Sequence, residues 1–174
     1  KFLSVSVVAT PEEDWSIDEV ADDFAQCARW AAECGADGVE ANFSCPNVSS
    51  VDGHLFLNPT DAGIVAAKLR EAIPDMPLLL KVGHIDKQET AHEFLERVAP
   101  FVNALVMVNG VSARVRRPSG ELLFEGRCRG IAGNASRETA LEQLSLFDGL
   151  IRKFGLDVKL VGVGGLGKAA DVRA

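Results

Sequence analysis

The sequence has only four cysteines, and none of them lies in a metal-binding or disulfide pattern. They stand at positions 27, 34, 45 and 128, without a CxxC pair or a Cys/His pair at ligand spacing. The three histidines also lack a partner at metal spacing. We therefore expect no metal site and no disulfide scaffold, and a reducing cytoplasm as the compartment.

Positive charge and long apolar runs are scarce as well. The chain has 18 Lys and Arg against 25 Asp and Glu, a net charge of −7 over 174 residues. A nucleic-acid partner is not expected, because its phosphates must be neutralised by clustered basic residues. No apolar run approaches the roughly 20 residues of a membrane helix, and no charged leader precedes a cleavable apolar segment. The composition is that of a globular protein with one sizeable core.

Short apolar runs alternate with amphipathic segments along the chain. Near-continuous apolar blocks, typical of parallel strands covered on both faces, occupy residues 2–9, 38–43, 78–83, 104–109 and 159–164. The segments between them repeat apolar residues at helical spacing. Ser16 with Glu19, and Asp86 with Glu89, each predict a capping box at a helix start. Gly35 and Gly155 predict helix ends, and Cys27 and Cys34 are expected to be small buried residues of the first helix.

The order βαβαβαβαβ predicts an α/β fold with a parallel sheet, either open and doubly wound or part of a barrel. No GxGxxG turn follows the first strand, and polar residues gather where the strands end, so we predict a (β/α)8 TIM barrel. A complete barrel takes roughly 250 residues. We therefore expect residues 1–174 to be the central part of one barrel domain, with about strands 3 to 7 present. Lys1 as first residue, without a methionine, indicates a cut end.

Residues 110–136 form a long inserted loop between a strand and a helix, where two to six residues are usual. This loop carries five arginines: Arg114, Arg116, Arg117, Arg127 and Arg129. It is interpreted as a lid, an anion contact or an interface, and a solvated insertion with scattered charges remains an equal alternative.

Cys45 stands in a polar loop directly after the second strand, between Ser44 and Pro46. A thiol with a pKa near 8.5 can accept a proton near neutral pH in a suitable environment. Asn42 and Asn47 on either side each offer a donor and an acceptor to a planar ligand. The alternative is a turn held by asparagines.

Two further strand ends carry polar groups. Lys81 lies in an apolar strand block, and its ammonium needs a polar partner, either an anion in a cavity or a structural salt bridge. Asn109 ends the next strand. After the last strand, Gly162, Gly164, Gly165 and Gly167 allow backbone N–H groups to approach a phosphate at a helix N-terminus.

Five motifs occur in order, namely VEANFSCPN, PLLLKVG, VMVNG, GRCRGIAG and KLVGVGGLG. Together they resemble the dihydroorotate dehydrogenases, FMN-dependent (β/α)8 barrels, and in particular the branch that uses a cysteine base. The resemblance implies oxidation of dihydroorotate to orotate in pyrimidine biosynthesis, with Cys45 as the catalytic base. It also implies a small-molecule dihydropyrimidine partner, held by Asn42, Asn47 and Asn109. FMN would be bound by Lys81, Gly130, Gly133, Gly164 and Gly165.

Departures from the family keep two alternatives open. Gly110 stands where a Thr or Ser is usual, and Ala132 replaces a common Ser. A flavin barrel similar to dihydropyrimidine dehydrogenase is the alternative enzyme. A degenerate barrel that binds a phosphate-bearing ligand or a protein partner is the non-enzymatic alternative. The sequence is compatible with a homodimer, and it does not identify the electron acceptor.

Overall fold

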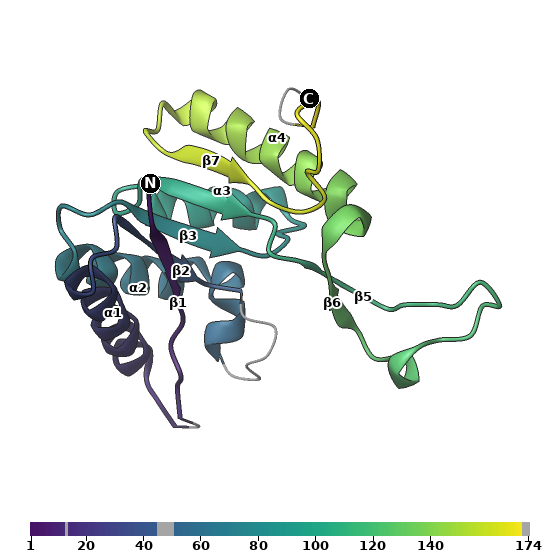
Figure 1. The fold of residues 1–174 in the computed structure, drawn as a ribbon, viewed down its shortest axis with the longest axis horizontal. Coiled ribbons are helices and arrows are strands. Elements are labelled where there is room, and N and C mark those ends of the chain that lie inside the picture. Colours follow the sequence, from purple (N-terminus) through teal and green to yellow (C-terminus); the bar gives the residue numbers. More distant parts are fainter. Residues whose placement is uncertain (13, 45–50, 172–174) are drawn as a thin grey trace.

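The computed structural model describes residues 1–12, 14–44 and 51–171. Its larger sheet holds β1 (Ser4–Val7), β2 (Gly38–Asn42), β3 (Leu78–Val82), β4 (Ala104–Met107) and β7 (Lys159–Gly162) (Figure 1). The α-helices are α1 (Ile17–Glu33), α2 (Pro59–Ala72), α3 (Gln88–Val98) and α4 (Arg137–Phe154). Short 3-10 helices span Val51–Leu57, Phe124–Gly126 and Gly133–Ser136. Among these described elements, no helix is both long and apolar enough to cross a bilayer.

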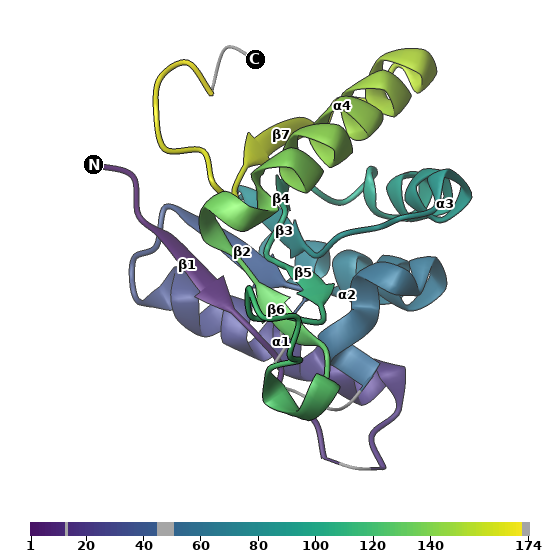
Figure 2. The same ribbon diagram turned by 90° about the vertical axis from the view of Figure 1, so that its right-hand side faces the viewer.

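The larger sheet is parallel throughout, with its five strands in the order β1-β2-β3-β4-β7. Because the strands advance in one direction and such crossovers are right-handed, the four α-helices lie on the same face of the sheet. Figure 2 shows this arrangement, with the helices in one layer beside the strands. The predicted α/β fold, with its five strands, is confirmed.

The burial of the strand residues follows from this layering. Four fully buried side chains point toward the helices, namely Val39, Ala41, Leu78 and Leu80. The residues that alternate with them, such as Glu40 and Lys81, face the other side of the sheet. The largest buried side chains between sheet and helices include Phe24, Phe43, Phe94 and Phe147. Phe24 and Phe43 meet edge to face, with ring centroids 5.5 Å apart. The side of the sheet without helices is thus available for polar groups.

The helix ends partly match the sequence prediction. At the start of α1, the Ser16 N–H donates to a Glu19 carboxylate oxygen (2.7 Å), and the Glu19 N–H donates to the Ser16 hydroxyl (3.3 Å). Helix α4 ends at Gly155, which adopts the left-handed conformation (φ +63°). The capping box predicted for Asp86 and Glu89 is wrong. Helix α3 begins one residue later, after Lys87, so Glu89 is in the second helical position, not the third.

Arg70 ties together the loops at the amino ends of the strands. Its guanidinium donates to the carbonyl oxygens of Phe101, Ile73, Pro74 and Met76 at 2.8–3.0 Å. It also donates to the side-chain oxygen of Asn103 (2.8 Å), which accepts the Leu78 N–H as well (2.9 Å). One side chain from α2 therefore connects the segments that precede β3 and β4.

The segment predicted as a long inserted loop contains two short strands. β5 (Val111–Ala113) pairs antiparallel with β6 (Arg129–Ile131), and the hairpin projects away from the sheet (Figure 1). Phe124, in the short 3-10 helix before β6, is 51% exposed, with the Arg129 guanidinium 5.6 Å from its ring centroid. Three-residue strands are too short to give a period-2 pattern, which is why the sequence did not indicate them.

Candidate active site

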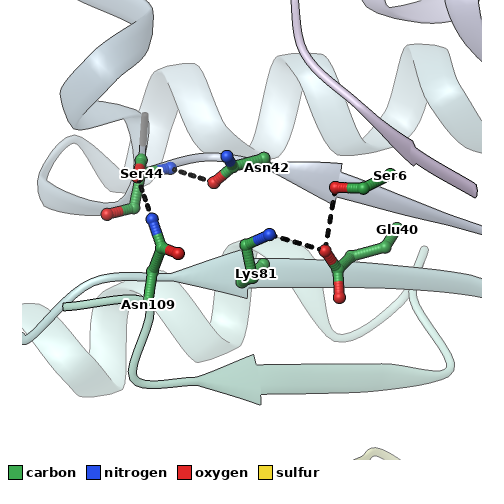
Figure 3. A network of polar contacts seen from close by, with 6 residues as sticks. All are labelled: Ser6, Glu40, Asn42, Ser44, Lys81 and Asn109. Atoms are coloured by element: carbon green, nitrogen blue, oxygen red, sulfur yellow. Dashed lines mark hydrogen bonds and ion pairs between the residues drawn. The ribbon is translucent and has the colours of Figure 1, made fainter. Parts of the chain in front are cut away.

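Polar side chains from three adjacent strands meet at the carboxyl end of the sheet. Asn42 ends β2, Lys81 is its register partner on β3, and Asn109 follows β4. Figure 3 shows these three side chains with Ser44 at the same edge. The structure therefore brings together three of the predicted site residues. In a barrel this is the edge where active sites are built.

Asn42 and Asn109 both bind the backbone of Ser44. The Ser44 N–H donates to the side-chain oxygen of Asn42 (3.2 Å), and the Asn109 side-chain amide donates to the Ser44 carbonyl. The alternative of a turn held by Asn42 and Asn47 extends into residues 45–50, which lie outside the described part of the chain. Each bond uses one of the two polar ends of its amide, and within residues 1–12, 14–44 and 51–171 the other end has no hydrogen-bond partner.

Cys45 and Asn47 lie outside the residues that the structure describes. Their predicted roles as catalytic base and substrate ligand therefore stay predictions. The described cysteines differ from the expectation in one case. Cys27 is half-buried, and burial, followed by the nearby Asp23, raises the pKa of its thiol. Cys34 is exposed at the end of α1, so its predicted burial is wrong.

Lys81 forms an ion pair with Glu40 on the side of the sheet that carries no helix. The Lys81 ammonium is 2.8 Å from a Glu40 carboxylate oxygen, and the Ser6 hydroxyl donates to the same oxygen at 2.9 Å (Figure 3). Both charged side chains are 19% exposed. The salt-bridge alternative for Lys81 is therefore observed, and Glu40 is a site residue that sequence reasoning missed.

The predicted glycines gather in part at the N-terminus of α4. Gly133, Gly164 and Gly165 all have positive φ, and a Cβ built on Gly165 would lie 2.7 Å from the Gly133 carbonyl oxygen. A groove of about 440 Å³ runs along this loop, lined by Asn134 and residues 162–167. Gly130 lies elsewhere, on the exposed hairpin strand β6 opposite Ser112. Three of the four glycines thus form one backbone cradle.

Asp171 holds the end of this glycine-rich loop. Its carboxylate accepts the backbone N–H groups of Gly167 (3.0 Å) and Lys168 (2.9 Å) and pairs with Arg137 of α4 (2.7 Å). The Arg137 guanidinium, with these backbone donors, lowers the pKa of the Asp171 carboxyl. Sequence reasoning missed this contact, because Arg137 and Asp171 are 34 residues apart and leave no local pattern.

Both the positive φ at Gly165 and the backbone atoms packed around it require a residue without a Cβ. We expect Gly165→Ala to lower the free energy of unfolding by about 2 kcal/mol, because φ is +70° and the new Cβ would meet backbone atoms of Gly133 and Asn134. Urea denaturation of the complete protein measures the change. Gly167→Ala is the matched control, since a Cβ there meets nothing within 4 Å. Equal losses in the two variants would contradict this account.

Gln143 of α4 holds the loop that follows Lys81. This buried side chain donates to the Gly83 carbonyl (2.9 Å) and accepts the Ile85 N–H (2.7 Å). A Cβ on Gly83 would lie 2.7 Å from the Ser44 hydroxyl, so the loop packs directly against Ser44. A glutamine in an amphipathic helix resembles a surface residue, and the sequence reasoning missed it.

Replacing Gln143 by Leu should therefore cost about 2 kcal/mol of unfolding free energy, because two buried backbone groups lose their partners. Chemical denaturation of the complete protein is the measurement. Glu142→Leu, an exposed change one residue away on the same helix, should stay within about 0.5 kcal/mol. The interpretation fails if Gln143→Leu is as stable as the parent.

Comparison with known proteins finds a similar enzyme along most of this chain. No family model matches the chain. A curated dihydroorotate dehydrogenase from Dictyostelium discoideum is 31% identical over 174 residues, which cover 95% of this chain and 46% of that protein. The chain is a relative of the dihydroorotate dehydrogenases. It spans about half the length of that enzyme, and the predicted resemblance is confirmed.

A solved structure supports the fold of this dihydroorotate dehydrogenase relative. DHODH from Eimeria tenella, in complex with ferulenol, superposes with a TM-score of 0.67 at 13% identity, over 98% of this chain and 48% of that one. At this identity the match concerns the fold alone. The parallel sheet with helices on one face is therefore part of a (β/α)8 barrel, as predicted.

Proposed function

We propose that the complete protein is a flavin-dependent oxidoreductase that converts dihydroorotate to orotate, a step of pyrimidine biosynthesis. The observation that carries this proposal is the meeting of Asn42, Lys81 and Asn109 at one edge of the sheet, in a chain related to a dihydroorotate dehydrogenase. Planar ligands with ring amides are well matched by asparagine side chains, which offer a donor and an acceptor each.

The residues around the glycine cradle fit FMN. Gly133, Gly164 and Gly165 leave the backbone bare beside a groove of about 440 Å³ at the start of α4, where N–H groups favour a phosphate. Lys81 would place a positive charge beside the flavin, which favours an electron-rich ring. Gly130 lies on the hairpin and not in the glycine cradle, so its contact with FMN stays a prediction. When bound, FMN supplies the acceptor for the hydride that leaves C6 of the substrate.

The chain's own residues would handle the substrate and its proton. In the proposed reaction Cys45, as thiolate, takes the proton from C5 while the hydride leaves C6, and the C5–C6 bond becomes double. Asn42, Asn47 and Asn109 would hold the ring so that both C–H bonds are correctly placed. Asn42 and Asn109 also bind the backbone of Ser44. They would thereby fix the residue next to the proposed base. Cytoplasmic location and a homodimer remain predictions.

The test is anaerobic. The visible flavin spectrum of the complete protein is recorded, dihydroorotate is added, and bleaching is followed. Bleaching is the expected result and would support both the cofactor and the substrate. A yellow protein that stays yellow would move the substrate to another dihydropyrimidine, and a colourless protein that cannot take up FMN would contradict the proposal.

A further inference from the structure

Glu40 has no role in the proposed chemistry, yet it lies at the centre of the polar group on the open face of the sheet. One of its carboxylate oxygens accepts from both the Ser6 hydroxyl (2.9 Å) and the Lys81 ammonium (2.8 Å). Ser6 is its register partner on β1, and Lys81 comes from β3. Three adjacent strands therefore contribute to one contact (Figure 3).

This contact decides where the lysine points. A lysine side chain has a flexible four-carbon stem and a compact charge, so without a fixed partner its ammonium samples many positions. Glu40 is anchored on its other side by Ser6, and both charged side chains are 19% exposed. A partly buried ion pair of this kind adds little to stability compared with apolar residues of the same size. The ion pair therefore contributes more to the orientation of the Lys81 side chain than to stability.

We propose that Glu40 is a positioning residue that fixes the Lys81 ammonium on the open face of the sheet, next to the polar strand ends, where it would meet the flavin. Lys81 and Asn42 are register partners, so their side chains leave the sheet side by side. The inference rests on the proposed function, because the flavin is the group that Lys81 would meet. Glu40 acts through Lys81 and touches no reacting atom.

Two substitutions at Glu40 distinguish the effect of its hydrogen-bond acceptor from the effect of its negative charge. In Glu40→Gln the side-chain oxygen can still accept from Ser6 and Lys81, whereas Glu40→Ala removes the acceptor. We expect Glu40→Ala to weaken FMN binding by the complete protein about tenfold, as the loss of a hydrogen bond to a charged group does. Glu40→Gln should stay within about threefold of the parent. Quenching of FMN fluorescence gives the dissociation constants.

The same comparison in a Lys81→Met background tests whether Glu40 acts through the lysine. There, Glu40→Ala should no longer weaken FMN binding, because there is no ammonium to position. The proposal is overturned if Glu40→Ala weakens binding equally with and without Lys81, or if Glu40→Gln behaves like Glu40→Ala.

A second readout needs no flavin. Reductive methylation of Lys81, followed by mass spectrometry of the flavin-free protein, should be faster in Glu40→Ala than in the parent or in Glu40→Gln. An unchanged rate in Glu40→Ala would show that Glu40 does not hold the lysine, and would overturn the inference. If the rate rises but the parent takes up no FMN, the proposed function fails and the Glu40–Lys81 positioning stands.

Discussion

Arg70→Met is expected to lower the free energy of unfolding by about 4 kcal/mol, among the largest losses for a single substitution in this chain. The Arg70 guanidinium donates to four backbone carbonyls and to Asn103. Methionine fills a similar volume but leaves these acceptors without their donor. Burial lowers the pKa of Arg70, with Asp75 acting in the opposite direction, yet a guanidinium stays charged at neutral pH.

Urea denaturation of the complete, flavin-free protein measures this loss. Arg70→Lys should recover little of it, because a single ammonium cannot reach acceptors spread around a planar fork. Arg152→Met is the matched control. Arg152 is exposed and pairs with Asp148 one turn away in α4, a contact worth about 0.5 kcal/mol or less. Comparable losses at Arg70 and Arg152 would show that the network does not hold the strand ends.

Cys45→Ala is expected to slow flavin reduction by dihydroorotate about 100- to 10,000-fold, the usual contribution of a general base. The proton at C5 would then have no acceptor at the place where the family resemblance puts one. FMN content should not change, because the proposed cradle is built from Gly133, Gly164 and Gly165. Anaerobic stopped-flow absorbance of the flavin gives the rate, and the flavin-to-protein ratio gives the content.

Cys34→Ala is the control for this experiment. Cys34 is exposed at the end of α1, where the chain enters the amino end of β2, opposite the carboxyl end that carries the site, and its removal should leave the rate at the parental value. A parental rate in Cys45→Ala would refute the base assignment while leaving the flavin barrel intact. A protein that loses its flavin on Cys45→Ala would instead point to a structural role for the thiol.

The central strands could be predicted from the sequence because they lie in a closely packed parallel sheet and are apolar over most of their length. Leu78, Leu80 and Val82 face the helices and are fully buried, so the run stands out from the polar segments around it. The cap of α3 was misplaced by one residue, as is common at helix ends. Asp86 and Glu89 have capping-box spacing, but spacing alone does not fix where a helix begins.

The site could be predicted only where residues follow a strand directly. Asn42, Lys81 and Asn109 were identified because parallel strands bring their carboxyl ends to one edge, whatever lies between them in sequence. Glu40 and Gln143 were missed for a different reason. Their roles depend on contacts with residues 41 and 60 positions away, and such contacts leave no local pattern in the sequence.

The hairpin β5–β6 begins and ends at one place, because Val111 is the register partner of Ile131. The chain therefore leaves the barrel just after Asn109 and returns just before Gly133, with the two crossing points side by side. A hairpin tied in this way can lengthen, shorten or exchange its tip over evolution without moving the asparagine or the glycine cradle. Variation in the hairpin is thereby separated from the residues at the strand ends.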